Sequence, residues 1–189
     1  MITSTWVDTE TTGIDPRDSG AFEVALLIYQ GKNCIFEKLY QLNPLNDEVK
    51  WSKEAYNVNG VSEETIRSYP PFEKVVPEIA ADLQTHIPPE KYVFAGYSCP
   101  FDFGHIGALF FRAGINHSDF FNGRLIDVYE LVKKAAASGL LPKTENQKLE
   151  TMTKALKIEH GIAHTAMDDI KATRRLYEAI WQIQQGVRA

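Results

Sequence analysis

The spacing of hydrophobic and polar positions predicts β structure in the first 42 residues. Residues 2–8 alternate small, β-branched and aromatic side chains, and residues 22–29 form a mostly apolar run. Both patterns are typical of strands. The turn residues Gly31-Lys32-Asn33 follow, and residues 34–42 are predicted to be the hairpin partner of the second strand. The N-terminal part of the chain is therefore predicted to form three strands.

Helical spacing begins after residue 45. Ser52 and Ser62 are predicted N-caps of two short helices. A longer helix is predicted to open at Pro70-Pro71, because an apolar stripe with helical spacing follows. Pro77 lies inside that stripe and predicts a kink or a late start.

Strands and helices alternate in the second half of the chain. Residues 92–95 and 124–126 are predicted as short strands, and a helix is predicted after each. Pro100 suits a helix start, which places Asp102 in the first turn, and Asp127 suits the cap of the next helix. A short helix is predicted near residues 149–156. A long C-terminal helix is predicted from the inward positions Ile170, Thr173, Leu176, Tyr177, Ile180 and Ile183.

Length and composition predict one globular domain spanning residues 1–189. The chain has 25 acidic and 20 basic residues, for a formal net charge of −5. A protein that binds nucleic acid through phosphate contacts alone is usually basic. Any nucleic acid is therefore expected to be bound locally, with metal ions supplying positive charge, and tight binding to long duplexes is not expected.

The sequence also bears on location. It has no apolar stretch long enough to span a bilayer and no basic-then-apolar leader, so no membrane association is expected. Cys34 and Cys99 suggest neither a disulfide framework nor a zinc site. The expected location is the cytoplasm or a comparable reducing compartment.

Two carboxylates mark the end of the first predicted strand. Side chains repeat every second residue along a strand, so Asp8 and Glu10 emerge on the same face. Acids this close repel each other, which gives an inert fold no advantage. A hard divalent cation such as Mg²⁺ or Mn²⁺ reverses that repulsion. By themselves, however, the two residues favour ordinary acids at a solvated strand end, because short acidic pairs are common.

The longer run Asp8-Thr9-Glu10-Thr11-Thr12-Gly13 resembles the first motif of the DEDDh 3′–5′ exonucleases. That group includes DnaQ-like proofreading subunits, ribonuclease T and oligoribonuclease. The family has two further motifs, and both have counterparts in the expected order. Phe101-Asp102 resembles the second, and His164 with Asp169 five positions later resembles the third.

The resemblance implies a ribonuclease H-like α/β fold. Such a fold has a five-stranded mixed sheet, with three antiparallel strands first and helices on both faces. It also implies a catalytic set of five residues. Two Mg²⁺ or Mn²⁺ ions are expected to be held by Asp8, Glu10, Asp102 and Asp169. His164 is expected to act as the general base that deprotonates the attacking water.

Asp168 is the neighbour that does not fit the family spacing. One step along a helix turns a side chain by about 100°, so only one of these two adjacent acids is expected to face the metals. The spacing selects Asp169.

Five further residues are nominated for substrate contact. In the family the turn after the first motif packs on the terminal nucleotide, which nominates Thr11 and Ile14, and Phe101 is a candidate for stacking. Ser98 stands where the family usually has Asn, and Asn59 where it usually has His. The implied activity releases nucleoside 5′-monophosphates from single-stranded or frayed 3′ ends, with DNA favoured.

Two alternatives remain at this point. One is an exoribonuclease for short RNA, since the sequence does not reveal a contact to the 2′-hydroxyl. The other is a non-catalytic subunit that binds a polymerase. The expected partners are single-stranded DNA or RNA 3′ ends, together with a polymerase or another replication or repair protein.

Overall fold

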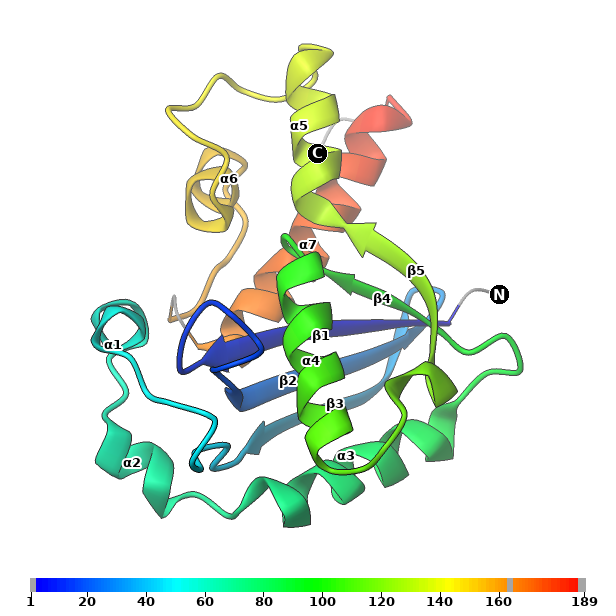
Figure 1. The fold of residues 1–189 in the computed structure, drawn as a ribbon. Coiled ribbons are helices and arrows are strands. Elements are labelled where there is room, and N and C mark those ends of the chain that lie inside the picture. Colours follow the sequence, from blue (N-terminus) through cyan, green and yellow to red (C-terminus); the bar gives the residue numbers. More distant parts are fainter. Residues whose placement is uncertain (1–2, 163–164, 187–189) are drawn as a thin grey trace.

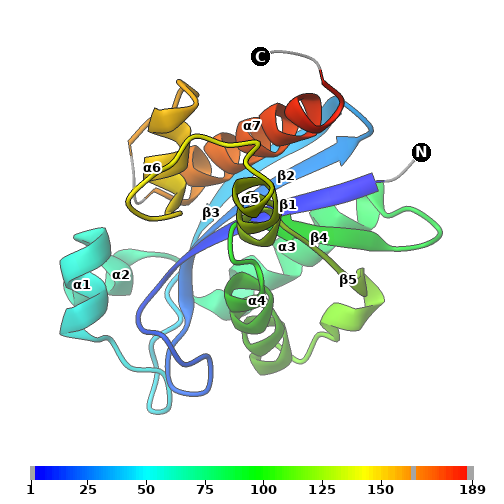
Figure 2. The same ribbon diagram turned by 90° about the horizontal axis from the view of Figure 1, so that it is seen from above.

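The computed structural model describes residues 3–162 and 165–186. Its centre is one five-stranded sheet with the strand order β3-β2-β1-β4-β5 (Figures 1 and 2). β1 pairs antiparallel with β2 and parallel with β4; β2 pairs antiparallel with β3, and β4 parallel with β5. The predicted mixed sheet, with three antiparallel strands first, is confirmed. The strands are β1 (Thr3–Thr11), β2 (Ala21–Gln30), β3 (Asn33–Gln41), β4 (Tyr92–Gly96) and β5 (Phe121–Asp127).

Helices cover both faces of the sheet, also as predicted (Figure 2). Neighbouring residues of β1 pack on opposite faces of the sheet. Val7 packs in the core with α3 and α4, and Trp6 packs in the core with α5, α6 and α7. α1 and α2 lie beyond the end of the sheet at which β1 finishes (Figure 1). The helices are α1 (Lys53–Asn59), α2 (Glu63–Ser68), α3 (Phe72–His86), α4 (Pro100–Arg112), α5 (Val128–Ala137), α6 (Leu149–Ala155) and α7 (Ala166–Gln184), with a 3₁₀ turn at His117–Asp119.

Local sequence signals account for most helix boundaries. The Ser52 and Ser62 side chains accept hydrogen bonds from the backbone N–H groups of Ala55 and Thr65, as their predicted capping role requires. Asp127 caps α5 by accepting from the N–H of Tyr129.

The expected late start of the helix that contains Pro77 is wrong. α3 begins at Phe72, directly after Pro71, and continues through Pro77 to His86. A proline removes one intrahelical hydrogen bond. Burial of the apolar stripe that includes Val76, Ile79 and Leu83 offsets that loss.

The last strand is also longer than predicted. It spans Phe121–Asp127, because the segment before Arg124 continues the pairing with β4. In the part of the chain that the structure describes, none of the helices has the length and apolar character needed to cross a membrane.

Candidate active site

Three carboxylates from distant parts of the sequence meet at the end of β1. Asp8 and Glu10 project from β1, and Asp169 lies in the first turn of α7. One oxygen of each lies within 4.8 Å of the others, and all three side chains are partly buried. The alternation of β1 places its two acids on one face, and the packing of α7 against β1 brings the third to them.

Asp102 approaches the same strand through a different contact. It lies in the first turn of α4 and is only 4% exposed. One of its carboxylate oxygens accepts hydrogen bonds from the Thr9 backbone N–H at 3.0 Å and from the Thr9 hydroxyl at 2.7 Å. Asp102 is therefore fixed to the residue between Asp8 and Glu10, outside the group of three oxygens within 4.8 Å.

Burial and mutual repulsion raise the pKa values of these acids. Loss of water around the Asp8 carboxyl raises its pKa well above the usual value, and the charges of Asp102 and Asp169 add to the effect. Burial, followed by the charge of Asp169, raises the pKa of Glu10 to about 8. Burial also raises the pKa of Asp102 to about 7, although the hydrogen bonds from Thr9 act in the opposite direction.

The chemistry of this donor set fits a hard divalent cation. All the converging ligand atoms are carboxylate oxygens, which Mg²⁺ and Mn²⁺ prefer. A bound cation also relieves the repulsion that raises the pKa values of the acids. The residues present thus fit the metal site that the sequence led us to expect.

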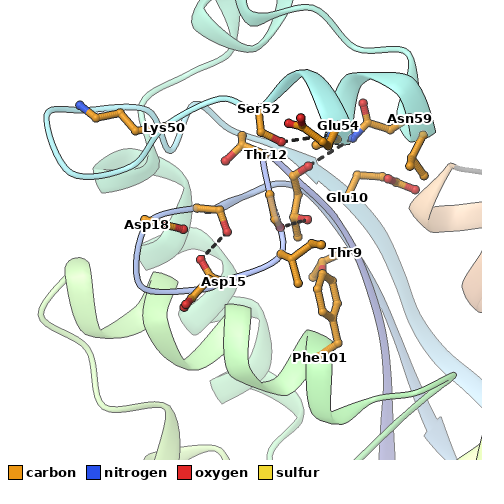
Figure 3. Close-up of a pocket in the computed structure, with 16 residues that line it drawn as sticks. Thr9, Glu10, Thr12, Asp15, Asp18, Lys50, Ser52, Glu54, Asn59 and Phe101 are labelled. Carbon is orange, nitrogen blue, oxygen red and sulfur yellow. Dashed lines mark hydrogen bonds between the residues drawn. The ribbon is translucent and has the colours of Figure 1, made fainter.

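A cavity of about 600 Å³ opens beside Glu10, between the turn that follows β1, α1 and the start of α4 (Figure 3). Of the nominated contact residues, Thr11, Ile14, Asn59 and Phe101 line it. Ile14 is 82% exposed and Phe101 is 39% exposed, so both offer apolar surface to a ligand.

The two polar residues nominated for substrate contact, Asn59 and Ser98, lie in different places. The Asn59 amide donates to the Thr11 carbonyl at 3.2 Å and accepts from the N–H of Val61, so it ties α1 to the end of β1. Ser98 lies instead in a separate cleft with Tyr97 and Tyr129. Its backbone N–H donates to Asp127 at 3.0 Å.

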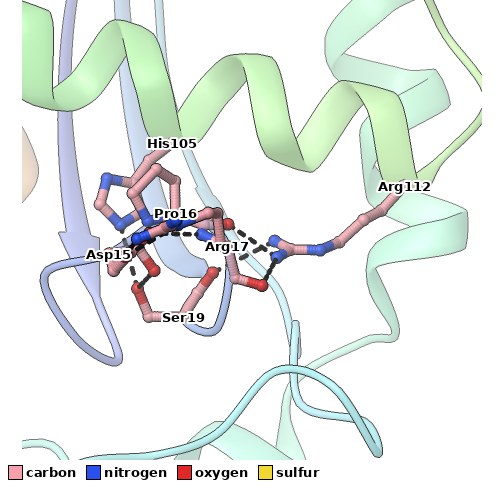
Figure 4. Close-up of polar contacts among 6 residues, drawn as sticks. All are labelled: Asp15, Pro16, Arg17, Ser19, His105 and Arg112. Carbon is pink, nitrogen blue, oxygen red and sulfur yellow. Dashed lines mark hydrogen bonds and ion pairs between the residues drawn. The ribbon is translucent and has the colours of Figure 1, made fainter.

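The loop that carries Ile14 is held against α4 (Figure 4). The Arg112 guanidinium donates hydrogen bonds to three carbonyls of this loop, those of Pro16 (2.7 Å), Arg17 (3.1 Å) and Ser19 (3.1 Å). His105, also on α4 and buried, contacts the Ser19 hydroxyl at 3.2 Å through Nε2. One wall of the cavity is therefore fixed by residues about 90 positions away in the chain.

Several of these residues were not nominated from the sequence. Thr9 could have been found, since it lies within the first motif, but its partner is 93 residues away. His160 is another: its Nε2 lies 2.6 Å from Asp169 Oδ1. Arg112 gave no signal, because an arginine near the end of a helix is usually a surface residue. His164, the predicted general base, lies outside the described residues.

One family model and several known proteins match the chain. The RNase_T model, described as exonuclease, matches residues 5–177. The PolC-type DNA polymerase III of Bacillus cereus is 27% identical over 168 residues, which is 88% of this chain and 10% of that protein. The DNA polymerase III epsilon subunit of Rickettsia conorii is 33% identical over 102 residues, which is 51% of this chain and 39% of that protein.

Solved structures of exonuclease I match in fold. The zinc-bound E. coli exonuclease I–single-stranded DNA complex superposes with a TM-score of 0.82 at 21% identity, covering 98% of this chain and 41% of that chain. A product-bound exonuclease I structure gives the same TM-score at 20% identity, covering 99% and 45%. The ribonuclease H-like architecture predicted from the sequence is confirmed. The chain spans less than half the length of each of these proteins.

Proposed function

The chain belongs to the DEDDh 3′–5′ exonuclease family, and on that premise we propose that it hydrolyses single-stranded or frayed 3′ ends and releases nucleoside 5′-monophosphates. The observation that carries this proposal is the convergence of Asp8, Glu10 and Asp169 within 4.8 Å. An inert fold gains nothing from three mutually repelling, partly buried carboxylates, whereas a metal-dependent hydrolase requires them.

The proposed cofactor is a pair of Mg²⁺ or Mn²⁺ ions held by the four acids Asp8, Glu10, Asp102 and Asp169. When bound, the ions would stabilise the charge that develops on the phosphodiester and activate a water. Thr9 keeps Asp102 in place through two hydrogen bonds. His164 is proposed to accept the proton of the attacking water, because the ordinary pKa of histidine, about 6.5, suits a base at neutral pH.

The terminal nucleotide is proposed to occupy the cavity beside Glu10. Ile14 and Phe101 both line that cavity with exposed apolar surface, and bases stack on an aromatic ring such as that of Phe101 without regard to sequence. Asn59 and Thr11 also line it, and their hydrogen bond ties α1 to the end of β1. Ser98 is proposed not to contact the terminal nucleotide directly, since it lines a different cleft.

Single-stranded DNA is the proposed substrate. Solved exonuclease I structures include complexes with single-stranded DNA and with a dT13 oligonucleotide. The names of the two sequence relatives are those of DNA polymerase III proteins. They support a second candidate role, in which the chain works beside a polymerase.

Cys34 is an exposed free thiol, which suits the proposed cytoplasmic location.

A direct assay tests the proposal. Purified protein is incubated with 5′-labelled single-stranded DNA or RNA of the same sequence, with Mg²⁺ or with EDTA. We expect stepwise shortening from the 3′ end in Mg²⁺, none in EDTA, and none when the 3′ end carries a phosphate. Faster digestion of RNA would favour the short-RNA alternative. Shortening from the 5′ end, or nicking of circular single strands, would contradict the proposed polarity.

A further inference from the structure

His160 contacts a proposed metal ligand and also has a second partner of its own. Its Nε2 lies 2.6 Å from Oδ1 of Asp169, and the two side chains are 11% and 17% exposed. On the other side of the ring, Nδ1 lies 3.3 Å from the hydroxyl of Thr153, a residue of α6 that is 1% exposed. α6, the segment before α7 and α7 itself are thus linked through one imidazole.

The hydrogen-bonding capacity of a carboxylate fixes the direction of the His160–Asp169 contact. An ionised carboxylate only accepts, so the Nε2 that faces Asp169 must carry the proton. The Thr153 hydroxyl donates its single proton to the Leu149 or Glu150 carbonyl, both at 3.0 Å. Its oxygen lies 3.3 Å from Nδ1 and so holds the other side of the ring in place.

The segment around His160 is anchored to α7 on both sides. Arg175 of α7 donates to the Glu159 carbonyl at 2.8 Å. Asp168 of α7 accepts from the N–H of Ile162 at 2.9 Å. The backbone of the segment that carries His160 is therefore fixed relative to α7, the helix that carries Asp169. With its backbone fixed, the imidazole can hold the Asp169 carboxylate in one orientation.

Resting on the proposed metal site, we propose that His160 is a positioning residue that orients the Asp169 carboxylate for the cations, with Thr153 as its support. Asp169 faces the repelling charges of Asp8 and Glu10. A donated hydrogen bond opposes the rotation that this repulsion favours. His160 is not a second general base, because both of its ring nitrogens already face partners. Outer partners of this kind commonly change metal affinity by about 10–100-fold.

Metal binding in the absence of substrate tests this role. Mn²⁺ is titrated into wild-type protein and into His160→Leu, His160→Gln and Thr153→Val by isothermal titration calorimetry. We expect His160→Leu to weaken Mn²⁺ binding by about 10–100-fold. His160→Gln retains an N–H donor and should lose less, and Thr153→Val should also lose less, because the ring remains. The matched control is His86→Gln, at the far end of α3, which should bind Mn²⁺ as wild type does.

Activity provides the second readout. The Mn²⁺ concentration for half-maximal rate should rise in His160→Leu by the same factor as the dissociation constant, and saturating Mn²⁺ should restore most of the rate. A structural role alone would instead lower the melting temperature without changing Mn²⁺ affinity in the folded protein. If His160→Leu does not fold, Thr153→Val decides, and wild-type Mn²⁺ affinity in that variant would overturn the proposal.

The outcomes separate this inference from the proposed function. Asp8→Asn is expected to abolish tight Mn²⁺ binding. If wild-type protein binds no Mn²⁺, or Asp8→Asn binds it equally well, the proposed metal site is wrong and the inference falls with it. If wild type binds Mn²⁺, Asp8→Asn does not, and folded His160→Leu matches wild type, the positioning role alone is overturned.

Discussion

Three consecutive residues at the end of β1 contribute to the candidate active site in three different ways. Asp8 faces Asp169, Thr9 turns to the opposite side and binds Asp102, and Glu10 borders both the acid cluster and the cavity. Strand alternation produces this division, because neighbouring side chains point to opposite faces. A short run of sequence can therefore gather acids that arrive from helices on both sides of the sheet.

Replacement of each proposed metal ligand by its amide should abolish turnover without unfolding the protein. Removing one of several repelling acids should leave the metal-free fold equally stable or more stable. Turnover in Mg²⁺ and melting temperature in EDTA measure the two effects. An amide variant with near-full activity would exclude that residue from the site. The substitutions are Asp8→Asn, Glu10→Gln, Asp102→Asn and Asp169→Asn.

Asp168→Asn is the matched control for Asp169→Asn. The Asp168 carboxylate accepts from the N–H of Ile162, and an asparagine oxygen can accept the same bond. Activity should therefore stay near wild type. An inactive Asp168→Asn together with an active Asp169→Asn would mean that the assigned register of the third motif is wrong.

Glu10 should make the stability of the metal-free protein depend on pH. Its pKa is about 8 in the folded protein, against an ordinary value of 4.5. Between these values the folded state holds a proton that the unfolded state has released, so the free energy of unfolding falls as pH rises from about 4.5 to about 8. Chemical denaturation in EDTA at several pH values should reveal this slope, and Glu10→Gln should reduce it. An equal slope in the variant would assign the effect to other groups.

His164→Ala should slow the chemical step by about 10²–10⁴-fold, the usual contribution of a general base. Mn²⁺ binding should change little, because His164 is not among the proposed ligands. The wild-type pH–rate profile should rise through the histidine pKa, about 6.5, and this rising limb should be absent in the variant. A full rate at neutral pH in His164→Ala would exclude the general-base role.

At the scale of elements, the loop after β1 depends on α4 for its shape. Arg112 is the main link, with hydrogen bonds to three loop carbonyls. Lys50 adds a backbone bond from the other side, since its N–H donates to the Asp18 carbonyl at 2.8 Å. The loop is therefore a preformed wall of the cavity, and its geometry is set by two segments outside the motif.

Arg112→Met should weaken substrate binding more than it slows chemistry. Loss of its hydrogen bonds frees the loop that carries Ile14, while the four acids keep their positions. We expect the KM for a short single-stranded oligonucleotide to rise several-fold with little change in kcat, and the free energy of unfolding to fall by roughly 1–2 kcal/mol. Steady-state kinetics and denaturation measure these. Arg67→Met removes an exposed ion pair with Glu63 on α2 and is the matched control. Equal KM values for the two variants would contradict the role of the loop.

At the scale of the molecule, a net charge of −5 limits how nucleic acid can be bound. Few phosphates can be neutralised, so stacking and metal contacts must supply most of the affinity. We expect binding of single-stranded DNA to Asp102→Asn to show a shallow salt dependence. A slope of about −2 for log K against log salt concentration corresponds to roughly three phosphates. Fluorescence anisotropy from low to high salt measures it, and a slope steeper than about −5 would indicate an extended basic track.

The sequence by itself determined the sheet, the order of the elements and the family. Strand alternation, helical spacing and capping residues depend on neighbours a few positions away, so they can be recognised without a structure. The three acidic motifs were also local. The fold prediction is confirmed, whereas the roles of the individual site residues stay predictions until variants are measured.

Only the tertiary structure decided which side chains support the acids and the cavity. Thr9 meets Asp102 across 93 positions, and Arg112 meets Pro16 across 96. Arg174, a charged residue that helical spacing alone would not bury, is 6% exposed, with its guanidinium 4.4 Å from the Tyr29 ring. Such pairs form because helices dock on a sheet built from distant segments, and the energy of docking depends on shape and burial at the interface. Local sequence patterns therefore do not predict which side chains meet at those interfaces.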